Sequence, residues 1–149
     1  MKILHAAKVF LRKRSDGKIL VSTRAENKKI LPGCFEFSAG GMLEINENPK
    51  EAVLREMQEE LNLQCNVEHF DFVDYVSRVT GDYIILHLYV GELEQDNISF
   101  NKDEIKEIVF YSLDEINALI KNQDENKFDM GYIQAFAKLQ KFLEKEKRA

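Results

Sequence analysis

Apolar residues recur along the chain in short runs that predict strands. Residues 3–11 are rich in apolar and β-branched residues, and residues 18–23 form a second such run after the turn-forming residues 15–17. The same arrangement recurs in residues 70–79 and 83–90, which flank Thr80-Gly81-Asp82. Apolar runs separated by Gly, Asp and Ser are typical of β-hairpins. We therefore predict two hairpins, and one further short strand over residues 108–111.

The clearest helix signal begins at Asn48. Asn is a favoured N-cap residue, Pro49 then occupies the first helical position, and Glu51 lies three residues after the cap. The helix should end near residue 61, because Asn62 tolerates the left-handed conformation that closes helices. Apolar residues spaced four apart form its expected buried stripe: Val53, Met57 and Leu61.

Two more helices are predicted in the C-terminal part of the chain. Ser112 and Glu115 have capping-box spacing and start a helix to about residue 121, while the apolar spacing of residues 129–145 suits a helix that packs on a sheet. The sequence contains no repeat, linker or low-complexity stretch. We therefore expect residues 1–149 to form a single domain of the α/β (α+β) class, with helices flanking a mixed sheet.

The composition agrees with a folded domain and limits its partners. The chain has 149 residues, 44% of them hydrophobic, and a formal net charge of −5. An acidic chain lacks the basic surface needed to bind duplex nucleic acid, and no apolar run approaches the ~20 residues of a membrane span. The first eight residues do not resemble a secretory signal. Cys34 and Cys65 lack metal-site spacing, so we expect reduced thiols in a cytoplasmic protein.

Acidic residues gather on one face of the first predicted helix. Glu56, Glu59 and Glu60 stand at i, i+3 and i+4, so their side chains project together. Like charges at this spacing destabilise a helix by a few tenths of a kcal/mol per pair, about 0.2–0.5. Solvent and nearby lysines could offset the repulsion, or a divalent cation could bind between the carboxylates. Taken alone, the run is more often a solvated helix face.

The wider spacing around this helix closely resembles the Nudix box. In that motif, Gly is followed after five residues by Glu and after seven more by Arg-Glu, an apolar residue, any residue, Glu-Glu, any residue, Gly and an apolar residue. Here the pattern runs from Gly41 through Glu47 to residues 55–63, and every fixed position matches except the last Gly, which is Asn62. A helix-ending residue at that position keeps the departure mild. Asn46 stands where many members have Gly, and neither change removes a ligand.

The resemblance implies a Nudix-like α/β/α sandwich that binds Mg²⁺ or Mn²⁺. Arg55 and Glu47 would brace the carboxylates of the site. The implied metal ligands are Glu56, Glu59 and Glu60, together with the carbonyl of Gly40.

The implied reaction is hydrolysis of a diphosphate linkage in a small nucleotide-like substrate. A bound cation would neutralise the diphosphate and orient a water for attack on phosphorus. The general base varies within the family, so Glu56, Glu59 or the remote Glu104 could serve, and Glu104 could equally be a solvated loop acid. The implied catalytic set is thus Glu56, Glu59, Glu104 and Arg55.

Substrate contacts are less defined by the sequence. Arg24 ends the second predicted strand, where family members often contact phosphate, although a surface role is equally compatible. Phe35 or Phe37 could stack on a base, but packing against the sheet is the commoner use of Phe. The substrate could be a nucleoside triphosphate, an ADP-ribose-like diphosphate, a nucleotide sugar or a dinucleoside polyphosphate, and the protein could be a monomer or a homodimer.

Two alternatives compete with hydrolysis. Residues 31–41 also look like the isopentenyl diphosphate isomerase branch of the same superfamily, which needs a cysteine in this segment. Aligning the Pro-Gly pairs puts that cysteine at Gly40, whereas Cys34 lies six residues earlier, so we expect no isomerase activity. A catalytically silent nucleotide-binding module is the second alternative, although such modules often have damaged boxes and the carboxylates here are intact.

Overall fold

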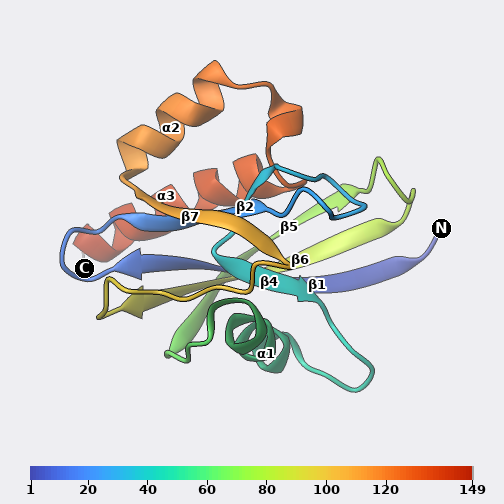
Figure 1. Ribbon diagram of the computed structural model, residues 1–149, viewed down its shortest axis with the longest axis horizontal. Coiled ribbons are helices and arrows are strands. Elements are labelled where there is room, and N and C mark those ends of the chain that lie inside the picture. The colour runs from blue at the N-terminus through green and yellow to red at the C-terminus, as the bar shows by residue number, and fades with distance from the viewer. Residues whose placement is uncertain (149) are drawn as a thin grey trace.

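The computed structural model describes residues 1–148 and shows helices on both faces of one mixed sheet (Figure 1). The strands are β1 (Ile3–Lys13), β2 (Ile19–Arg24), β3 (Phe35–Glu36), β4 (Ala39–Met42), β5 (Val67–Val76), β6 (Tyr83–Leu93) and β7 (Ile105–Tyr111). The helices are α1 (Pro49–Leu61), α2 (Leu113–Asn122) and α3 (Tyr132–Arg148), with a short 3-10 turn over Glu125–Lys127. The predicted fold class is confirmed.

The sheet is built around β1. Its strand order is β3-β2-β1-β6-β5, while β4 also pairs with β1 and β7 with β2. β1 runs parallel to β6 from Ile3–Tyr83 to Lys13–Leu93, and antiparallel to β4. β5 and β6 form the second predicted hairpin, with antiparallel pairing from Val67 to Val76.

The first predicted hairpin is much shorter than the two runs suggested. β1 and β2 pair only at Arg12 and Ile19, after which β2 turns away to pair with β3 and β7. The two-residue β3 and the glycine-containing β4 carry too short an apolar pattern to be predicted. The last strand begins at Ile105, three residues before the prediction, and α3 runs over Tyr132–Arg148 in place of residues 129–145.

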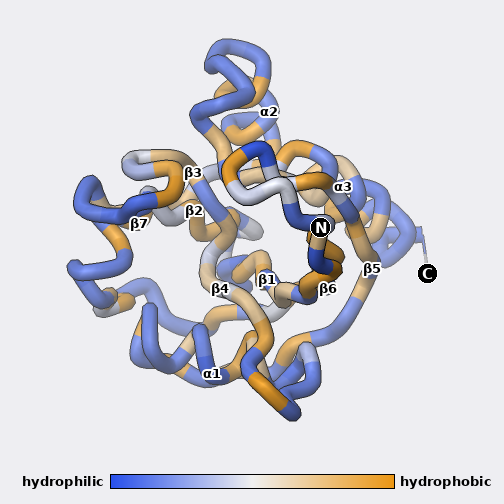
Figure 2. The backbone as a smooth tube through the Cα atoms, turned by 90° about the vertical axis from the view of Figure 1, so that its right-hand side faces the viewer, coloured by the Kyte–Doolittle hydropathy of each residue, from blue (hydrophilic) through white to orange (hydrophobic). Residues whose placement is uncertain are grey.

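Side chains of β1 point alternately to the two faces of the sheet, so the core has two layers. Ala6 and Phe10 face α2 and α3, whereas Val9 and Leu11 face α1. Figure 2 shows β1 and β6 in the middle of the molecule, with α1 on one side and α2 on the other. Full burial of an apolar side chain such as Met57 contributes about 1.5–3 kcal/mol, so both layers hold the sheet rigidly.

None of the helices within residues 1–148 combines the length and apolar character of a membrane-crossing segment.

Candidate active site

Helix α1 carries the acidic residues and is fixed at both ends by local interactions. The Asn48 side chain accepts a hydrogen bond from the Glu51 amide at 2.8 Å, and the Glu51 carboxylate accepts one from the Asn48 amide at 2.9 Å. Asn62 closes the helix in the left-handed conformation, with φ 53°. Both predicted caps are confirmed. The predicted stripe of Val53, Met57 and Leu61 is buried. Helix α1 also packs against β4, and the acidic face of the helix is turned toward this strand and the neighbouring loops.

The glycine pair of β4 lets α1 approach the sheet. A Cβ on Gly41 would lie 2.7 Å from Oε1 of Glu56. Gly40 adopts φ +144°, a conformation that favours glycine, and its amide donates to Oε1 of Glu60 at 2.9 Å. Gly40 also pairs with Lys8 across the β1–β4 ladder. The glycine pair therefore brings the carboxylates of α1 against the sheet, beside the largely buried Lys8.

Arg55 joins the acids of the loop and the helix. Its Nε and Nη2 donate to the two carboxylate oxygens of Glu47 at 2.8 and 3.0 Å, and Nη1 donates to Glu56 at 2.8 Å and to Glu59 at 3.4 Å. It also forms an ion pair with Glu44 at 2.9 Å. These contacts raise the pKa of Arg55, and its hydrogen bonds lower the pKa of Glu47 to about 2. Arg55 and Glu47 thus stand where the resemblance predicted a brace.

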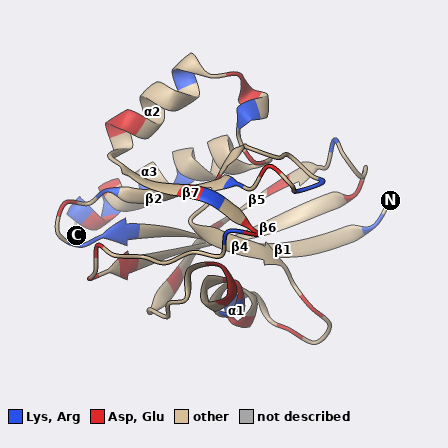
Figure 3. Cartoon of the chain, viewed as in Figure 1, with Lys and Arg blue, Asp and Glu red and all other residues tan. Residues whose placement is uncertain are grey.

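The carboxylates of α1 differ in how far they are removed from water. Figure 3 shows acidic residues gathered on α1 beside largely uncharged strands. Glu60 is buried, and the Glu56 side chain is 18% exposed, while that of Glu59 is 57% exposed. Desolvation raises the pKa of both Glu56 and Glu60, and neighbouring carboxylates add to the effect, Glu59 at Glu56, and Glu36 and Glu56 at Glu60. Such a pair favours a cation between its members.

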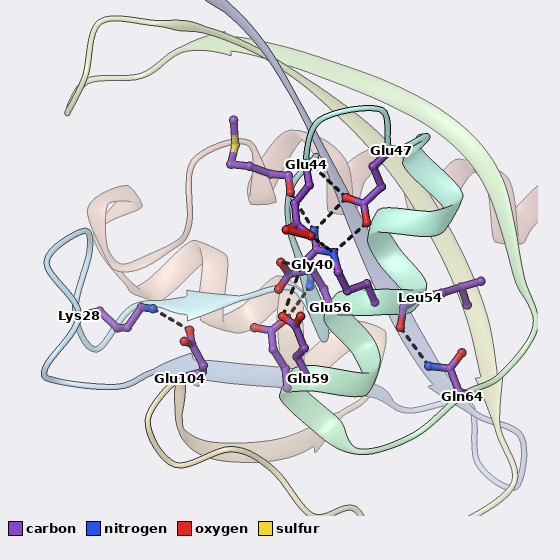
Figure 4. Close-up of polar contacts among 12 residues, drawn as sticks. Lys28, Gly40, Glu44, Glu47, Leu54, Glu56, Glu59, Gln64 and Glu104 are labelled. Atoms are coloured by element: carbon purple, nitrogen blue, oxygen red, sulfur yellow. Dashed lines mark hydrogen bonds and ion pairs between the residues drawn. The ribbon is translucent and has the colours of Figure 1, made fainter.

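Five side chains from two parts of the chain enclose a cavity of about 390 Å³ beside α1. It is lined by Glu56, Glu59, Glu60, Asn101 and Glu104. Glu104 belongs to the loop before β7 and lines the same cavity as Glu56 and Glu59, while its carboxylate is turned toward Lys28 (Figure 4). It forms an ion pair with Lys28 at 2.6 Å. The structure thus places Glu104 at the same cavity as the three acids of α1. The sequence alone could not decide whether Glu104 lies near them.

The donor set suits a hard divalent cation. Within residues 1–148, no group of three or more His, Cys, Asp or Glu side chains is placed so that it could hold a metal ion by itself. Mg²⁺ rarely uses a cage made of protein ligands alone, since it usually binds one or two carboxylates and fills its octahedron with water and substrate phosphate. The half-buried Glu56, the buried Glu60 and the exposed Glu59 supply carboxylate oxygens of this kind around one cavity. The residues present therefore fit Mg²⁺ or Mn²⁺.

A second cavity of about 380 Å³ continues from the first. Glu56, Glu60 and Glu104 line both. The second cavity also contains apolar side chains of β1 and β6, among them Leu4 and Ile84. The two spaces together form a cleft with an acidic end and a more apolar end.

Three basic residues line this cleft, and each has an acidic partner. Lys8 forms an ion pair with Asp129 at 3.4 Å, Arg24 with Glu36 at 3.2 Å, and Lys28 with Glu104 at 2.6 Å. The Lys8 and Asp129 side chains are each 13% exposed. Burial by itself would lower the pKa of Lys8, but Asp129, Glu36 and Glu60 outweigh it and raise the pKa, so Lys8 stays charged.

The residues predicted to contact the substrate make other contacts within the protein. Arg24 lines the cleft, but its Nε donates to the Ile30 carbonyl at 2.9 Å and its Nη1 to Glu36, so the guanidinium ties down the loop after β2. Phe37 is 1% exposed and packs between Phe10 and Tyr132 in the core. Phe35 packs on Phe128, with ring centroids 5.4 Å apart. The Phe37 ring offers no face for base stacking, and the half-buried Phe35 also packs against the core, as Phe more commonly does.

Several residues of the cleft, and Glu36, which pairs with Arg24, carry no signal in the sequence. Lys8 lies within an apolar strand, and Lys28 lies in a loop that holds another lysine. Glu36 is a buried acid, where desolvation raises the pKa to about 7. Asp129 was placed only at the start of a predicted helix. A charged residue inside an apolar run, as at Lys8, is the single pattern that could have drawn attention.

Comparison with known proteins agrees with this geometry. The family model described as NUDIX domain matches residues 3–132. The uncharacterized Nudix hydrolase YfcD of Escherichia coli K12 is 33% identical over 106 residues, which cover 68% of this chain and 56% of that protein. The uncharacterized Nudix hydrolase orf19 of Rhodococcus erythropolis is 26% identical, covering 79% of this chain and 68% of that one. The chain thus spans just over half the length of YfcD.

Solved structures share the fold at low sequence identity. The MutT protein of Methanosarcina mazei Go1 matches with a TM-score of 0.79 and 19% identity, covering 95% of both chains. The NUDIX domain of Shewanella oneidensis NrtR, solved in complex with ADP ribose, matches with a TM-score of 0.73 and 15% identity, covering 96% of this chain and 90% of that one. The acidic helix, its arginine brace, the family model and these relatives agree, and the chain belongs to the Nudix hydrolase family.

Proposed function

We propose that this protein is a divalent-cation-dependent hydrolase that cleaves a diphosphate linkage in a small nucleotide-like substrate. The observation that carries the proposal is the ring of carboxylates around one cavity: Glu56, Glu59, Glu60 and Glu104. Four acids around one hollow repel one another unless cations neutralise them. Arg55 and Lys28 balance part of this charge, and a Mg²⁺ or Mn²⁺ ion would neutralise more of it and hold an anionic diphosphate beside the acids.

The residues of the site have separable tasks. Glu56, Glu59 and Glu60 would hold the cation, with the Gly40 carbonyl as an additional ligand. When bound, the cation supplies charge neutralisation at the phosphates and lowers the pKa of water. Arg55 keeps Glu56 and Glu59 in place through its hydrogen bonds, which it can do because Glu47 holds the opposite side of its guanidinium.

Hydrolysis then needs a base to take a proton from water. The water oxygen forms a bond to phosphorus, the bridging P–O bond breaks, and the leaving phosphate carries away the electron pair. Glu104 is our proposed base because it lies on the wall of the cavity opposite α1, which leaves space for the phosphate between them. Glu56 and Glu59 are the alternatives, but a carboxylate committed to a cation and to Arg55 accepts a proton less readily.

Isomerase chemistry is not favoured by the cysteine. The Cys34 thiol is buried, donates to the Asn126 carbonyl at 3.3 Å, and lines neither cavity of the cleft. Burial raises its pKa, which keeps it as a thiol. Turnover of isopentenyl diphosphate by the purified protein would overturn this assignment.

The substrate class is the open part of the proposal, and a panel tests it. The purified protein would be incubated with ADP-ribose, nucleoside triphosphates, nucleotide sugars and dinucleoside polyphosphates, with Mg²⁺, Mn²⁺ or EDTA, at slightly alkaline pH. ADP-ribose is a useful first compound because the similar NrtR domain was solved with it bound. We expect cation-dependent release of phosphate products from at least one class. Ligand binding without any turnover across the panel would instead favour a silent binding module.

A further inference from the structure

We propose that Lys28 is the residue that binds the substrate's diphosphate, and that it does so by exchanging the carboxylate of Glu104 for a phosphate oxygen. This inference rests on the proposed function, since it assigns the phosphate contact of that same cleft. It differs from the expectation that Arg24 makes this contact.

The argument begins with the basic residues that line the cleft. They are Lys8, Arg24 and Lys28. The same wall contains more acids than bases: Glu56, Glu60, Asp82, Glu104 and Asp129. An anionic substrate therefore needs a basic side chain that can leave its acidic partner at low cost.

Separating Lys8 or Arg24 from its acidic partner would cost considerable free energy. Lys8 and Asp129 are both largely buried, so separating them would leave an uncompensated charge inside the protein. The Glu36 partner of Arg24 is 7% exposed, and Arg24 also holds the Ile30 carbonyl. If Arg24 moved to a phosphate, the Glu36 carboxylate would be left buried without its partner, and the loop that contains Ile30 would lose its contact with Arg24.

Lys28 differs in both respects. Its side chain and that of Glu104 are 27% and 41% exposed, so water can solvate whichever member is released. Glu104 also lines the cavity of the α1 acids, so its partner reaches the edge of that cavity (Figure 4). A lysine is a point charge on a flexible stem, which suits a contact that must move from one oxygen to another.

The exchange has a consequence for the acid as well. While Lys28 holds it, the Glu104 carboxylate is committed to an ion pair at 2.6 Å. Once a phosphate takes the ammonium group, Glu104 is free to accept a proton from water. Glu104 and the phosphate thus compete for one cation, and arrival of the substrate itself releases the proposed base.

If Glu104 and phosphate compete for Lys28, replacing Lys28 and replacing Glu104 should change the affinity for a diphosphate in different ways. The affinity for imidodiphosphate measures both effects. This diphosphate analogue has a nitrogen in the bridge, and its affinity can be measured calorimetrically with Mg²⁺ present. Lys28→Met should weaken binding by about tenfold or more, because a charged contact is lost. Glu104→Gln should bind at least as tightly as wild type, because the competitor is gone. Lys28→Arg should recover most of the affinity, and Lys29→Met, an exposed neighbour with the same charge change, should bind as wild type does.

A purely structural ion pair would behave differently. If the contact only tethers two loops, Lys28→Met and Glu104→Gln should change affinity in the same direction and by similar amounts, and that result would overturn the proposal. Equal affinity of Lys28→Met and Lys29→Met would overturn it too. The assay uses no turnover, so an inactive wild type would count against the proposed function while leaving the assignment of Lys28 to be decided by binding.

Discussion

Arg55 and Glu47 meet in a two-point contact, with Nε and Nη2 of the guanidinium 2.8 and 3.0 Å from the two carboxylate oxygens. This contact fixes the plane of the guanidinium, so Nη1 is directed at Glu56 and Glu59. A loop acid therefore controls the position of two helix acids that it does not touch.

Replacing Glu47 should affect activity and acid stability together. We expect Glu47→Gln to reduce turnover by about 10–100-fold, the range for residues that orient metal ligands. The pKa of Glu47 is about 2, below its ordinary 4.5, because Arg55 donates to it. A lowered carboxyl pKa contributes stability above pH 4.5, and that stability is lost as the pH falls toward 2.

Urea unfolding at several pH values checks the second part. The difference in free energy of unfolding between wild type and Glu47→Gln should shrink between pH 6 and pH 2.5. Glu26→Gln, which changes an exposed acid paired with Lys106, is the control. A difference that stays constant over this range would show that the Arg55 contact does not lower the pKa of Glu47.

Removing the charge of a helix acid should abolish activity without unfolding the protein. We predict that Glu59→Gln and Glu60→Gln each reduce turnover by at least about 100-fold, as for loss of a charge-stabilising ligand. The fold should persist, because Gln at position 60 can still accept the hydrogen bond from the Gly40 amide and no longer carries a buried charge. Melting temperature and turnover, measured on the same samples, check both parts, and wild-type turnover in both variants would contradict the assignment.

The two glycines of β4 should respond differently to alanine. At Gly41, the added Cβ meets only the flexible end of Glu56, so Gly41→Ala should displace that carboxylate and lower activity while stability changes little. At Gly40, the Cβ would meet the backbone of Ala7 and Lys8, and φ is +144°, so Gly40→Ala should destabilise the fold itself. Thermal unfolding and turnover separate the two effects. Wild-type turnover in Gly41→Ala would mean that Gly41 is not needed to make room for Glu56.

Glu36 should make the protein less stable as the pH rises. Desolvation raises its pKa to about 7 from 4.5, despite Lys8 and Arg24 nearby. A raised carboxyl pKa means that the protonated form is favoured in the folded state, so the stability is present below pH 4.5 and is lost as the pH rises through 7. Relative to Glu36→Gln, the wild type should therefore lose stability between pH 5 and pH 8. Parallel stability curves for the two proteins over this range would contradict the assigned pKa.

The sequence predicted best what is decided locally. Asn48, Pro49 and Asn62 set both ends of α1 through contacts within a few residues, so its bounds agree with the structure. The spacing of Glu56, Glu59 and Glu60 likewise follows from helical geometry alone.

What the sequence could not predict depends on contacts between distant segments. The parallel pairing of β1 with β6 joins Ile3 to Tyr83, and nothing near either residue encodes it. Lys28 and Glu104 lie 76 residues apart and meet only because β2 and β7 are neighbours in the sheet. The sequence favoured a packing role for Phe37 over base stacking but could not decide between them, and the structure gives it a core position.

Binding of Mn²⁺, followed by electron paramagnetic resonance, tests most directly whether the acids of α1 hold a divalent cation. The signal of free Mn²⁺ falls when the ion is bound, so a titration of the protein without any phosphate ligand gives the affinity of the site. We predict that wild type binds Mn²⁺, and that Glu60→Gln binds it at least about tenfold more weakly, as expected when a ligand or its support is lost. Equal affinities, or no binding by the wild type, would contradict the account.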